Sequence, residues 1–149
     1  MNISVKKVEP NSVLNDRLLN FVENSSWIET KKHTAKMIRE NIFNDWESMF
    51  VAMDGNKIVG HASFMKTDYY PLPKVFPWIS TIFVDEQYRG LKISGILIDY
   101  INGYAKKLGF ERTYISSEHF GIYEKYGYEY IMDIQNYGGG NDHLFCKKI

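Results

Sequence analysis

Apolar residues recur along the chain with two different periods, and these periods predict its secondary structure. A helical period is strongest over residues 93–108, which predicts one long amphipathic helix. The run that precedes it, Trp78–Val84, is rich in Ile, Phe and Val and predicts a buried strand. Residues 78–108 therefore predict a strand, a short polar loop and a helix. The apolar positions of that helix are Ile93, Leu97, Ile101, Tyr104, Ala105 and Leu108.

The rest of the chain predicts five elements before this segment and four after it. The first group is a strand at Ile3–Val8, a helix from Asn11 or Ser12 through Phe21, a helix from Thr30 to about Phe43, and a hairpin of Met49–Met53 and Lys57–Met65. The second group is a strand at Thr113–Ser116, a short helix at Ile122–Tyr126, and strands at Tyr128–Gln135 and Asp142–Lys147. Strands in hairpins at both ends, with helices between, predict a mixed α/β sheet.

Composition narrows the classes of function. A chain of 149 residues fits a single domain over 1–149, and its 18 Lys and Arg residues equal its 18 Asp and Glu residues. We therefore expect neither a nucleic-acid nor a membrane partner, and no apolar run is long enough to span a bilayer. The first residues lack the apolar core of a signal peptide, so a cytoplasmic protein is expected. Cys146 is the only cysteine, and we expect no metal site.

The loop between the central strand and helix has the features of an anion-binding site. The first N–H groups of a helix have no partners inside the helix, and they attract anions. The loop adds Arg89 and Lys92, and it has Gly90 and Gly95 where a side chain would hinder a close approach. This pattern predicts a phosphate site, and an ordinary strand-to-helix turn with a solvated arginine is the alternative.

Two motifs carry a resemblance to the GNAT superfamily of acyl-CoA-dependent N-acetyltransferases. Residues 79–98 resemble its motif A, which has Gln or Arg, two residues, Gly, one residue, and Gly or Ala. The sequence here is Arg89-Gly90-Leu91-Lys92-Ile93-Ser94, so lysine and serine replace the small residues. Gly121–Tyr128 resembles a second landmark, Tyr-x-x-x-Gly-aromatic. The resemblance implies a mixed, mostly antiparallel sheet of about six to seven strands flanked by helices.

The resemblance also implies a donor and the residues that bind it. The donor is acetyl-CoA, and backbone N–H groups of the central strand, near Ile82 to Val84, polarise its carbonyl. Tyr123 is implied as the proton donor to the departing thiolate, since a phenol stays protonated at neutral pH. Coenzyme contacts are implied at Ile82, Phe83, Val84, Arg89, Gly90, Leu91, Lys92, Ile93, Ser94, Gly95 and Tyr126.

The residues themselves suggest where the acceptor amine binds and loses its proton. Glu118 and His119 follow the predicted strand 113–116 and are the predicted catalytic bases, with Asp68 as a further candidate. An anionic and aromatic pocket suits a cationic amine, polyamine-like or aminoglycoside-like. The predicted substrate-binding residues are Trp27, Asp68, Tyr69, Tyr70 and Trp78.

The sequence therefore predicts an N-acetyltransferase that moves an acetyl group from acetyl-CoA to a primary amine of a small molecule by direct attack in a ternary complex. One alternative is a non-catalytic acyl-CoA-binding or sensing module, favoured by Lys92 and by a central strand with only Ser80 and Thr81 where many relatives have glutamate. Another is an acetyltransferase for a protein or peptide amine. A nucleotide-binding domain is disfavoured because no phosphate-loop or dinucleotide motif is present. A homodimer remains open.

Overall fold

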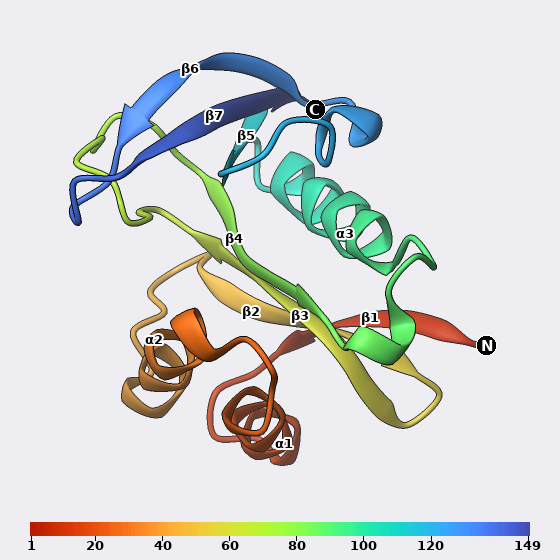
Figure 1. Ribbon diagram of the computed structural model, residues 1–149. Helices are drawn as coiled ribbons and strands as arrows, with labels where there is room; N and C mark the ends of the chain where they lie inside the picture. Colours follow the sequence, from red (N-terminus) through yellow and green to blue (C-terminus); the bar gives the residue numbers. More distant parts are fainter.

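The computed structural model describes residues 1–149, and its centre is one seven-stranded sheet (Figure 1). The spatial order of the strands is β1-β2-β3-β4-β5-β7-β6. Only β4 and β5 run parallel, so the predicted mixed and mostly antiparallel sheet is confirmed. The strands are β1 (Ile3–Val8), β2 (Ser48–Asp54), β3 (Lys57–Met65), β4 (Trp78–Val84), β5 (Arg112–Ser117), β6 (Glu129–Gln135) and β7 (Asn141–Lys148).

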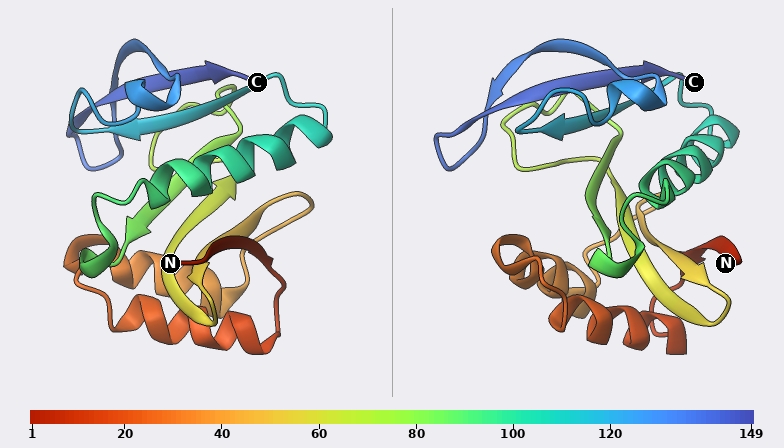
Figure 2. Two further views of the ribbon diagram at one scale, coloured as in Figure 1. Left: turned by 90° about the vertical axis from the view of Figure 1, so that its right-hand side faces the viewer. Right: turned by 45° about the vertical axis from the view of Figure 1, so that its right-hand side comes forward.

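Three α-helices cover the two faces of the sheet, as Figures 1 and 2 show. Helices α1 (Val13–Glu23) and α2 (Ile28–Glu40) pack on one face, and α3 (Ile93–Lys107) packs on the other. Two single-turn 3₁₀ helices, η1 (Glu86–Tyr88) and η2 (Glu124–Tyr126), follow β4 and β5. None of the helices has the length and apolar character needed to cross a bilayer.

The alternation of side chains along β2 explains why both faces can be covered. Phe50 and Ala52 belong to the cluster beneath α3, whereas Met49 and Val51 belong to the cluster beneath α1 and α2. Successive residues of a strand point to opposite faces, so a strand between two helical layers is apolar at every position. The continuous apolar runs of the central strands thus reflect burial on both sides.

Three local predictions need correction. Helix α2 begins two residues earlier and ends three residues earlier than predicted. It ends early because Asn41 has a φ of 47°, a left-handed conformation that stops the helix. The short helix predicted from Ile122 is only the single turn η2, which Gly127 ends with a φ of 92°. Helix α3 ends at Lys107, and Leu108, which was predicted as one of its apolar positions, is 46% exposed and does not belong to the core.

Candidate active site

Strands β4 and β5 diverge, and the opening between them organises the site (Figure 1). They share one residue pair, Trp78 with Tyr114, and no further pairing follows. Strand β4 also carries a bulge, because His61 pairs with Phe83 whereas Ser63 pairs with Ser80. The predicted carbonyl-binding stretch, Ile82 to Val84, follows this bulge on the part of β4 that β5 leaves uncovered.

The bulge holds one residue in a strained conformation. Thr81 has a φ of 49°, which is rare for a β-branched residue and costs about 1–3 kcal/mol. Its hydroxyl donates to Ser63 Oγ at 3.0 Å, which ties the bulge to β3. Strain of this kind is retained where it aims backbone groups that a regular strand would direct elsewhere.

The N-terminus of α3 presents free hydrogen-bond donors. The first intrahelical bond runs from Ile96 N to Lys92 O at 3.1 Å, and no side chain caps the helix. The N–H groups of Ile93, Ser94 and Gly95 therefore donate to no protein acceptor. Lys92 has a φ of 62°, a conformation that glycine adopts without strain. Lysine thus stands at a position that demands a left-handed backbone, and this supports the alignment of the motif.

Tyr126 of η2 lies against the first turn of α3. A Cβ atom at Gly95 would lie 2.6 Å from Tyr126 Cε1, so only glycine leaves room for the ring. The hydroxyl groups of Tyr126 and Ser94 are 3.0 Å apart and share a hydrogen bond. Lys147 Nζ donates to Tyr126 O at 2.8 Å from the other side. The absence of a side chain at Gly95 therefore serves the packing of Tyr126.

The side chain of Arg89 lies along the end of β4. Its Nε donates to Val84 O at 3.2 Å, and its guanidinium lies 5.6 Å from the centre of the Phe83 ring. Phe83 packs against Phe21 of α1, so the guanidinium is on the side of β4 away from α3. What the loop offers an anion is thus its backbone N–H groups and Lys92. The side chain of Leu91 is 45% exposed, while that of Ile93 is buried.

A cavity of about 790 Å³ passes through the opening between β4 and β5. Ile82 and Tyr123, which pack against the cluster beneath α3, line it together with residues from the opposite face. Most of the predicted acceptor and catalytic residues come together here. Of these, Trp27, Asp68, Tyr69, Tyr70, Glu118, His119 and Tyr123 line the cavity.

Two tyrosines of the cavity have distinct surroundings. Burial raises the pKa of Tyr123 to about 12, so its hydroxyl keeps its proton at neutral pH. Tyr69 lies on the loop before β4, and its ring makes an edge-to-face contact with Tyr137 of the β6–β7 turn, with ring centres 5.8 Å apart. Tyr137 N also donates to Tyr69 O at 3.2 Å. These contacts join the loop and the turn into a wall of the cavity.

Trp78 is not part of this cavity, so its prediction as a substrate-binding residue is wrong. It is 1% exposed, and its ring stacks on Tyr70 at 5.5 Å. Its Nε1 donates to Val75 O at 2.7 Å, which satisfies its polar atom inside the protein. Trp78 is a core residue, because it is the one residue of β4 that pairs with β5.

The cavity is strongly acidic although the chain as a whole has no net charge. Glu29, Asp68, Glu118 and Asp142 line it, and no lysine or arginine does. Asp142 Oδ2 accepts from Tyr70 Oη at 2.7 Å and from Asn136 Nδ2 at 3.1 Å. Sequence reasoning missed Glu29 and Asp142 as cavity residues. For Asp142, nothing in the local sequence indicates that the start of β7 faces the loop before β4.

Asp68 is the carboxylate most closely tied to β4. Its Oδ2 accepts from Ser80 Oγ at 2.7 Å, and its Oδ1 accepts from Tyr69 N at 2.7 Å. Burial raises the pKa of Asp68, although these two hydrogen bonds oppose the shift. His33 of α2 also opposes it, and the charge of Asp142 adds to it. No group of three or more His, Cys, Asp or Glu side chains is arranged to hold a metal ion.

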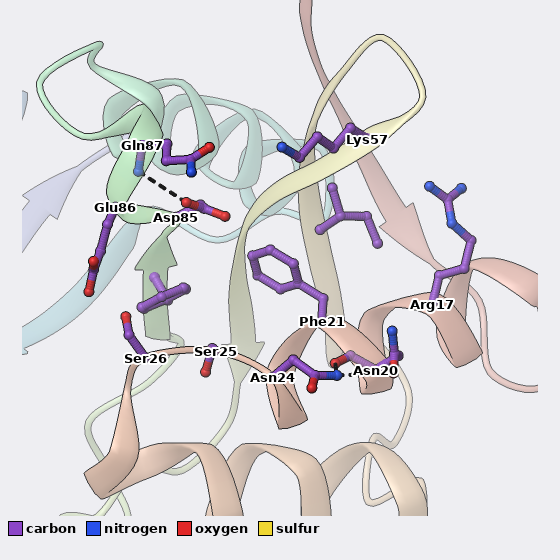
Figure 3. A pocket seen from close by; sticks show the side chains of 12 residues that line it. Arg17, Asn20, Phe21, Asn24, Ser25, Ser26, Lys57, Asp85, Glu86 and Gln87 are labelled. Atoms are coloured by element: carbon purple, nitrogen blue, oxygen red, sulfur yellow. Dashed lines mark hydrogen bonds between the residues drawn. The ribbon is translucent and has the colours of Figure 1, made fainter.

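A second cavity of about 600 Å³ lies between α1 and η1 (Figure 3). Arg17 and Lys57 lie on one side of it and Asp85 and Glu86 on the other, and Phe83 is the one predicted site residue in its lining. The Phe83 side chain thus lies on the face of the sheet away from α3, where it contacts Phe21 and the guanidinium of Arg89.

An aromatic stack separates the two cavities. Trp27, which lines the larger one, stacks on Phe83 with ring centres 5.7 Å apart. His61 lies beneath this pair, 1% exposed, with its Nδ1 unpaired. Burial lowers the pKa of His61 to about 4, so this ring is neutral at pH 7.

Comparison with protein families decides the assignment. The sequence matches the Acetyltransferase (GNAT) domain family over residues 45–130, which is more than half of the chain. The chain belongs to the GNAT acetyltransferase family. Membership of this family confirms the predicted class of enzyme and removes the nucleotide-binding alternative. Comparison with curated proteins gave no match.

Solved structures of GNAT proteins share the fold over nearly the whole chain. The aminoglycoside 6'-N-acetyltransferase from Enterococcus faecium has a TM-score of 0.74 at 19% identity, covering 99% of this chain and 97% of that one. An aminoglycoside 6'-N-acetyltransferase in complex with coenzyme A has a TM-score of 0.72 at 18% identity, with coverage of 99% and 97%. The ribosomal-protein-S18-alanine N-acetyltransferase from Escherichia coli has a TM-score of 0.71 at 13% identity, with coverage of 99% and 94%.

Proposed function

We propose that this GNAT acetyltransferase transfers the acetyl group of acetyl-CoA to a primary amine of a small molecule that carries more than one positive charge. The observation that carries the proposal is one acidic cavity that passes between β4 and β5 from one face of the sheet to the other. A donor on the α3 side and an acceptor on the α2 side meet in this opening. In this proposal residues 1–149 act as one catalytic domain, since α2 contributes Glu29 to the acceptor side.

The coenzyme site fits a diphosphate through its backbone. The N–H groups of Ile93, Ser94 and Gly95 have no protein acceptor, and the positive end of the α3 dipole lies behind them. Lys92 adds a full positive charge at the same point. Tyr126 covers the first turn and orients Ser94 through their shared hydrogen bond. These features support binding of the phosphates by the main chain, with the side chains shaping the loop.

The β4 bulge serves the carbonyl of the thioester. Ile82, the residue after Thr81, lines the cavity. In this proposal, backbone N–H groups within Ile82 to Val84 stabilise the negative charge that develops on the carbonyl oxygen. A donor preorganised in this way is worth roughly 3 kcal/mol in the transition state. The tie between Thr81 and Ser63 keeps these donors aimed at the cavity.

Tyr123 acts on the departing sulfur as a hydrogen-bond donor. Its pKa of about 12 lies roughly 3.5 units above that of a thiol, so complete transfer of its proton would cost about 5 kcal/mol. The hydroxyl therefore passes a proton to the thiolate only as it gains one from the attacking nitrogen. This arrangement needs no covalent intermediate, and Cys146 does not line the cavity.

The acidic lining supports a polycationic acceptor. Four carboxylates with no lysine or arginine stabilise an ammonium group, and the rings of Trp27, Tyr69 and Tyr137 add cation–π contacts. The aminoglycoside acetyltransferases of similar fold support a small polyamine over an acidic substrate. The wall formed by Tyr69 and Tyr137 also favours a small molecule over a polypeptide as the acceptor. A polypeptide amine is the second candidate, because a ribosomal-protein-S18-alanine N-acetyltransferase has a similar fold.

The test is a turnover assay with a designed panel of acceptors. The protein is incubated with acetyl-CoA and with polyamines, monoamines of matched size, amino acids and a short peptide with a free N-terminus, while free thiol is followed. We expect kcat/KM to be highest for polyamines and to fall as salt is added, since exposed charges are screened. If calorimetry showed coenzyme binding but no amine in the panel caused release of free thiol from acetyl-CoA, the sensing module would be established instead. A preference for the peptide would establish the second candidate.

A further inference from the structure

We propose that Ser80 and Asp68 form a proton relay that deprotonates the acceptor amine. This inference rests on the proposed function and assigns the base of that reaction. Ser80 lies on β4 and lines the cavity, and its hydroxyl donates to Asp68 Oδ2 at 2.7 Å. The second oxygen of Asp68 accepts from Tyr69 N at 2.7 Å, which fixes the orientation of the carboxylate. The relay thus begins one residue before the bulge at Thr81.

Among the four carboxylates of the cavity, only Asp68 hydrogen-bonds a residue of β4. Glu29 and Glu118 are exposed and hydrogen-bond nothing on that strand. Asp142 is held by Tyr70 and Asn136, on the loop before β4 and the β6–β7 turn. A base must lie within hydrogen-bond reach of the proton it removes, directly or through one intervening group. Asp68 meets this condition through Ser80, next to the stretch that receives the thioester.

The burial of Asp68 favours its protonation. Burial is the main effect, and the negative charge of Asp142 adds to it, whereas His33 and the hydrogen bonds from Ser80 and Tyr69 oppose it. A carboxylate with a raised pKa is a better proton acceptor near neutral pH. Its protonation also removes one of the negative charges that hold the acceptor as an ammonium ion. The same step therefore prepares both the base and the nucleophile.

The step is balanced in atoms and charge. One proton of the bound ammonium group moves to Ser80 Oγ while the hydroxyl proton of Ser80 moves to Asp68 Oδ2. The products are a neutral amine, an unchanged serine and a neutral carboxylic acid. The nitrogen lone pair then forms the C–N bond, the C–S bond breaks, and a second nitrogen proton reaches the sulfur through Tyr123. Asp68 returns its proton to solvent after the product leaves.

The experiment compares two acceptors that differ in one property. One is a diamine, whose amine is charged at pH 7, and the other is its mono-aminooxy analogue, which keeps the second cation but presents an uncharged nucleophile. Asp68→Asn lowers kcat for the diamine by about 10²- to 10³-fold and for the analogue by less than about tenfold. Ser80→Ala shows the same selective loss of kcat for the diamine. Ser80→Thr keeps a hydroxyl at this position, and its kcat for the diamine stays within about tenfold of wild type.

A matched control and an internal ratio keep the result interpretable. Asp133→Asn removes a carboxylate that Tyr130 and His143 hydrogen-bond outside the cavity, and it leaves both rates unchanged. The ratio of the two rates within each variant cancels any loss of folded protein. Equal losses for both acceptors, or no loss, would overturn the relay. Preferential wild-type turnover of the diamine over the peptide upholds the proposed function whatever this ratio is, so the two failures are distinguishable.

Discussion

The contact between Gly95 and Tyr126 makes a substitution at Gly95 unusually informative. An added Cβ atom lies 2.6 Å from Tyr126 Cε1 and 3.1 Å from both Cδ1 and Cζ. The ring has no free path away, because the hydrogen bond to Ser94 and the bond from Lys147 to Tyr126 O hold it. Gly95→Ala therefore separates η2 from the first turn of α3 and disturbs the coenzyme loop.

The expected magnitude follows from three contributions. Overpacking of this kind costs about 1–3 kcal/mol, and loss of the bond between Ser94 and Tyr126 costs about 1 kcal/mol. The better helix propensity of alanine returns up to about 1 kcal/mol. The net loss is about 1–3 kcal/mol in the free energy of unfolding. For a chain of 149 residues this lowers the thermal midpoint by about 2–12 °C.

Gly103→Ala is the matched control on the same helix. Gly103 is exposed, and an added Cβ atom there meets nothing within 4 Å. Only the gain in helix propensity remains, so the free energy of unfolding rises by about 0.5–1 kcal/mol. Thermal unfolding followed by circular dichroism measures both variants, and calorimetry measures their affinity for acetyl-CoA. We expect Gly95→Ala to weaken that affinity by about tenfold or more and Gly103→Ala to leave it unchanged.

Two outcomes would refute this reasoning. If Gly95→Ala were as stable as wild type with full coenzyme affinity, the packing of Tyr126 on α3 would not shape the loop. If Gly103→Ala lost as much stability as Gly95→Ala, the loss would belong to any substitution of glycine in α3 and not to the contact with Tyr126.

Three further predictions concern single residues. Lys92→Gly relieves the left-handed strain and raises the free energy of unfolding by roughly 0.5–1 kcal/mol, measured by urea titration; an unchanged or lower value would contradict the strain. Tyr123→Phe lowers kcat by about a hundredfold with unchanged calorimetric affinity for acetyl-CoA, and full turnover would remove Tyr123 from the mechanism. The pKa of His61 is about 4 in the folded protein and 6.5 in the unfolded chain, so the unfolded chain binds more protons. The free energy of unfolding therefore falls by about 2 kcal/mol from pH 7 to pH 5. His61→Phe keeps the ring and lacks this fall, and an equal fall in the variant would assign it to other groups.

Local patterns were sufficient for the order of the elements. The strand, loop and helix of residues 78–108 were predictable because a helical period and a continuous apolar run are signals within the segments themselves. The hairpin around Gly55 was predictable for the same reason, since its turn residues are adjacent in the chain. Boundaries were less certain: α2 ends where Asn41 adopts a left-handed conformation, which an apolar period does not indicate.

The lining of the cavity depended on contacts between distant segments. Tyr69 lies on the loop before β4, and Trp78 is the first residue of that strand. Trp78 is nevertheless buried in the core, whereas Tyr69 lines the cavity. The reason lies in the pairing of Trp78 with Tyr114, which is the one residue pair that β4 and β5 share before they diverge. No property of the tryptophan itself distinguishes a core position from a cavity wall.

The sequence by itself determined the elements, their order and the family, because each rests on residues that are near one another in the chain. Only the tertiary structure decided which side chains share the cavity. Strand β7 lies between β5 and β6, and this order brings Asp142 to a site shared with Asp68 and Ser80. The acidity of the cavity is therefore a property of how the strands are ordered, since a chain with no net charge gives no sign of where its carboxylates gather.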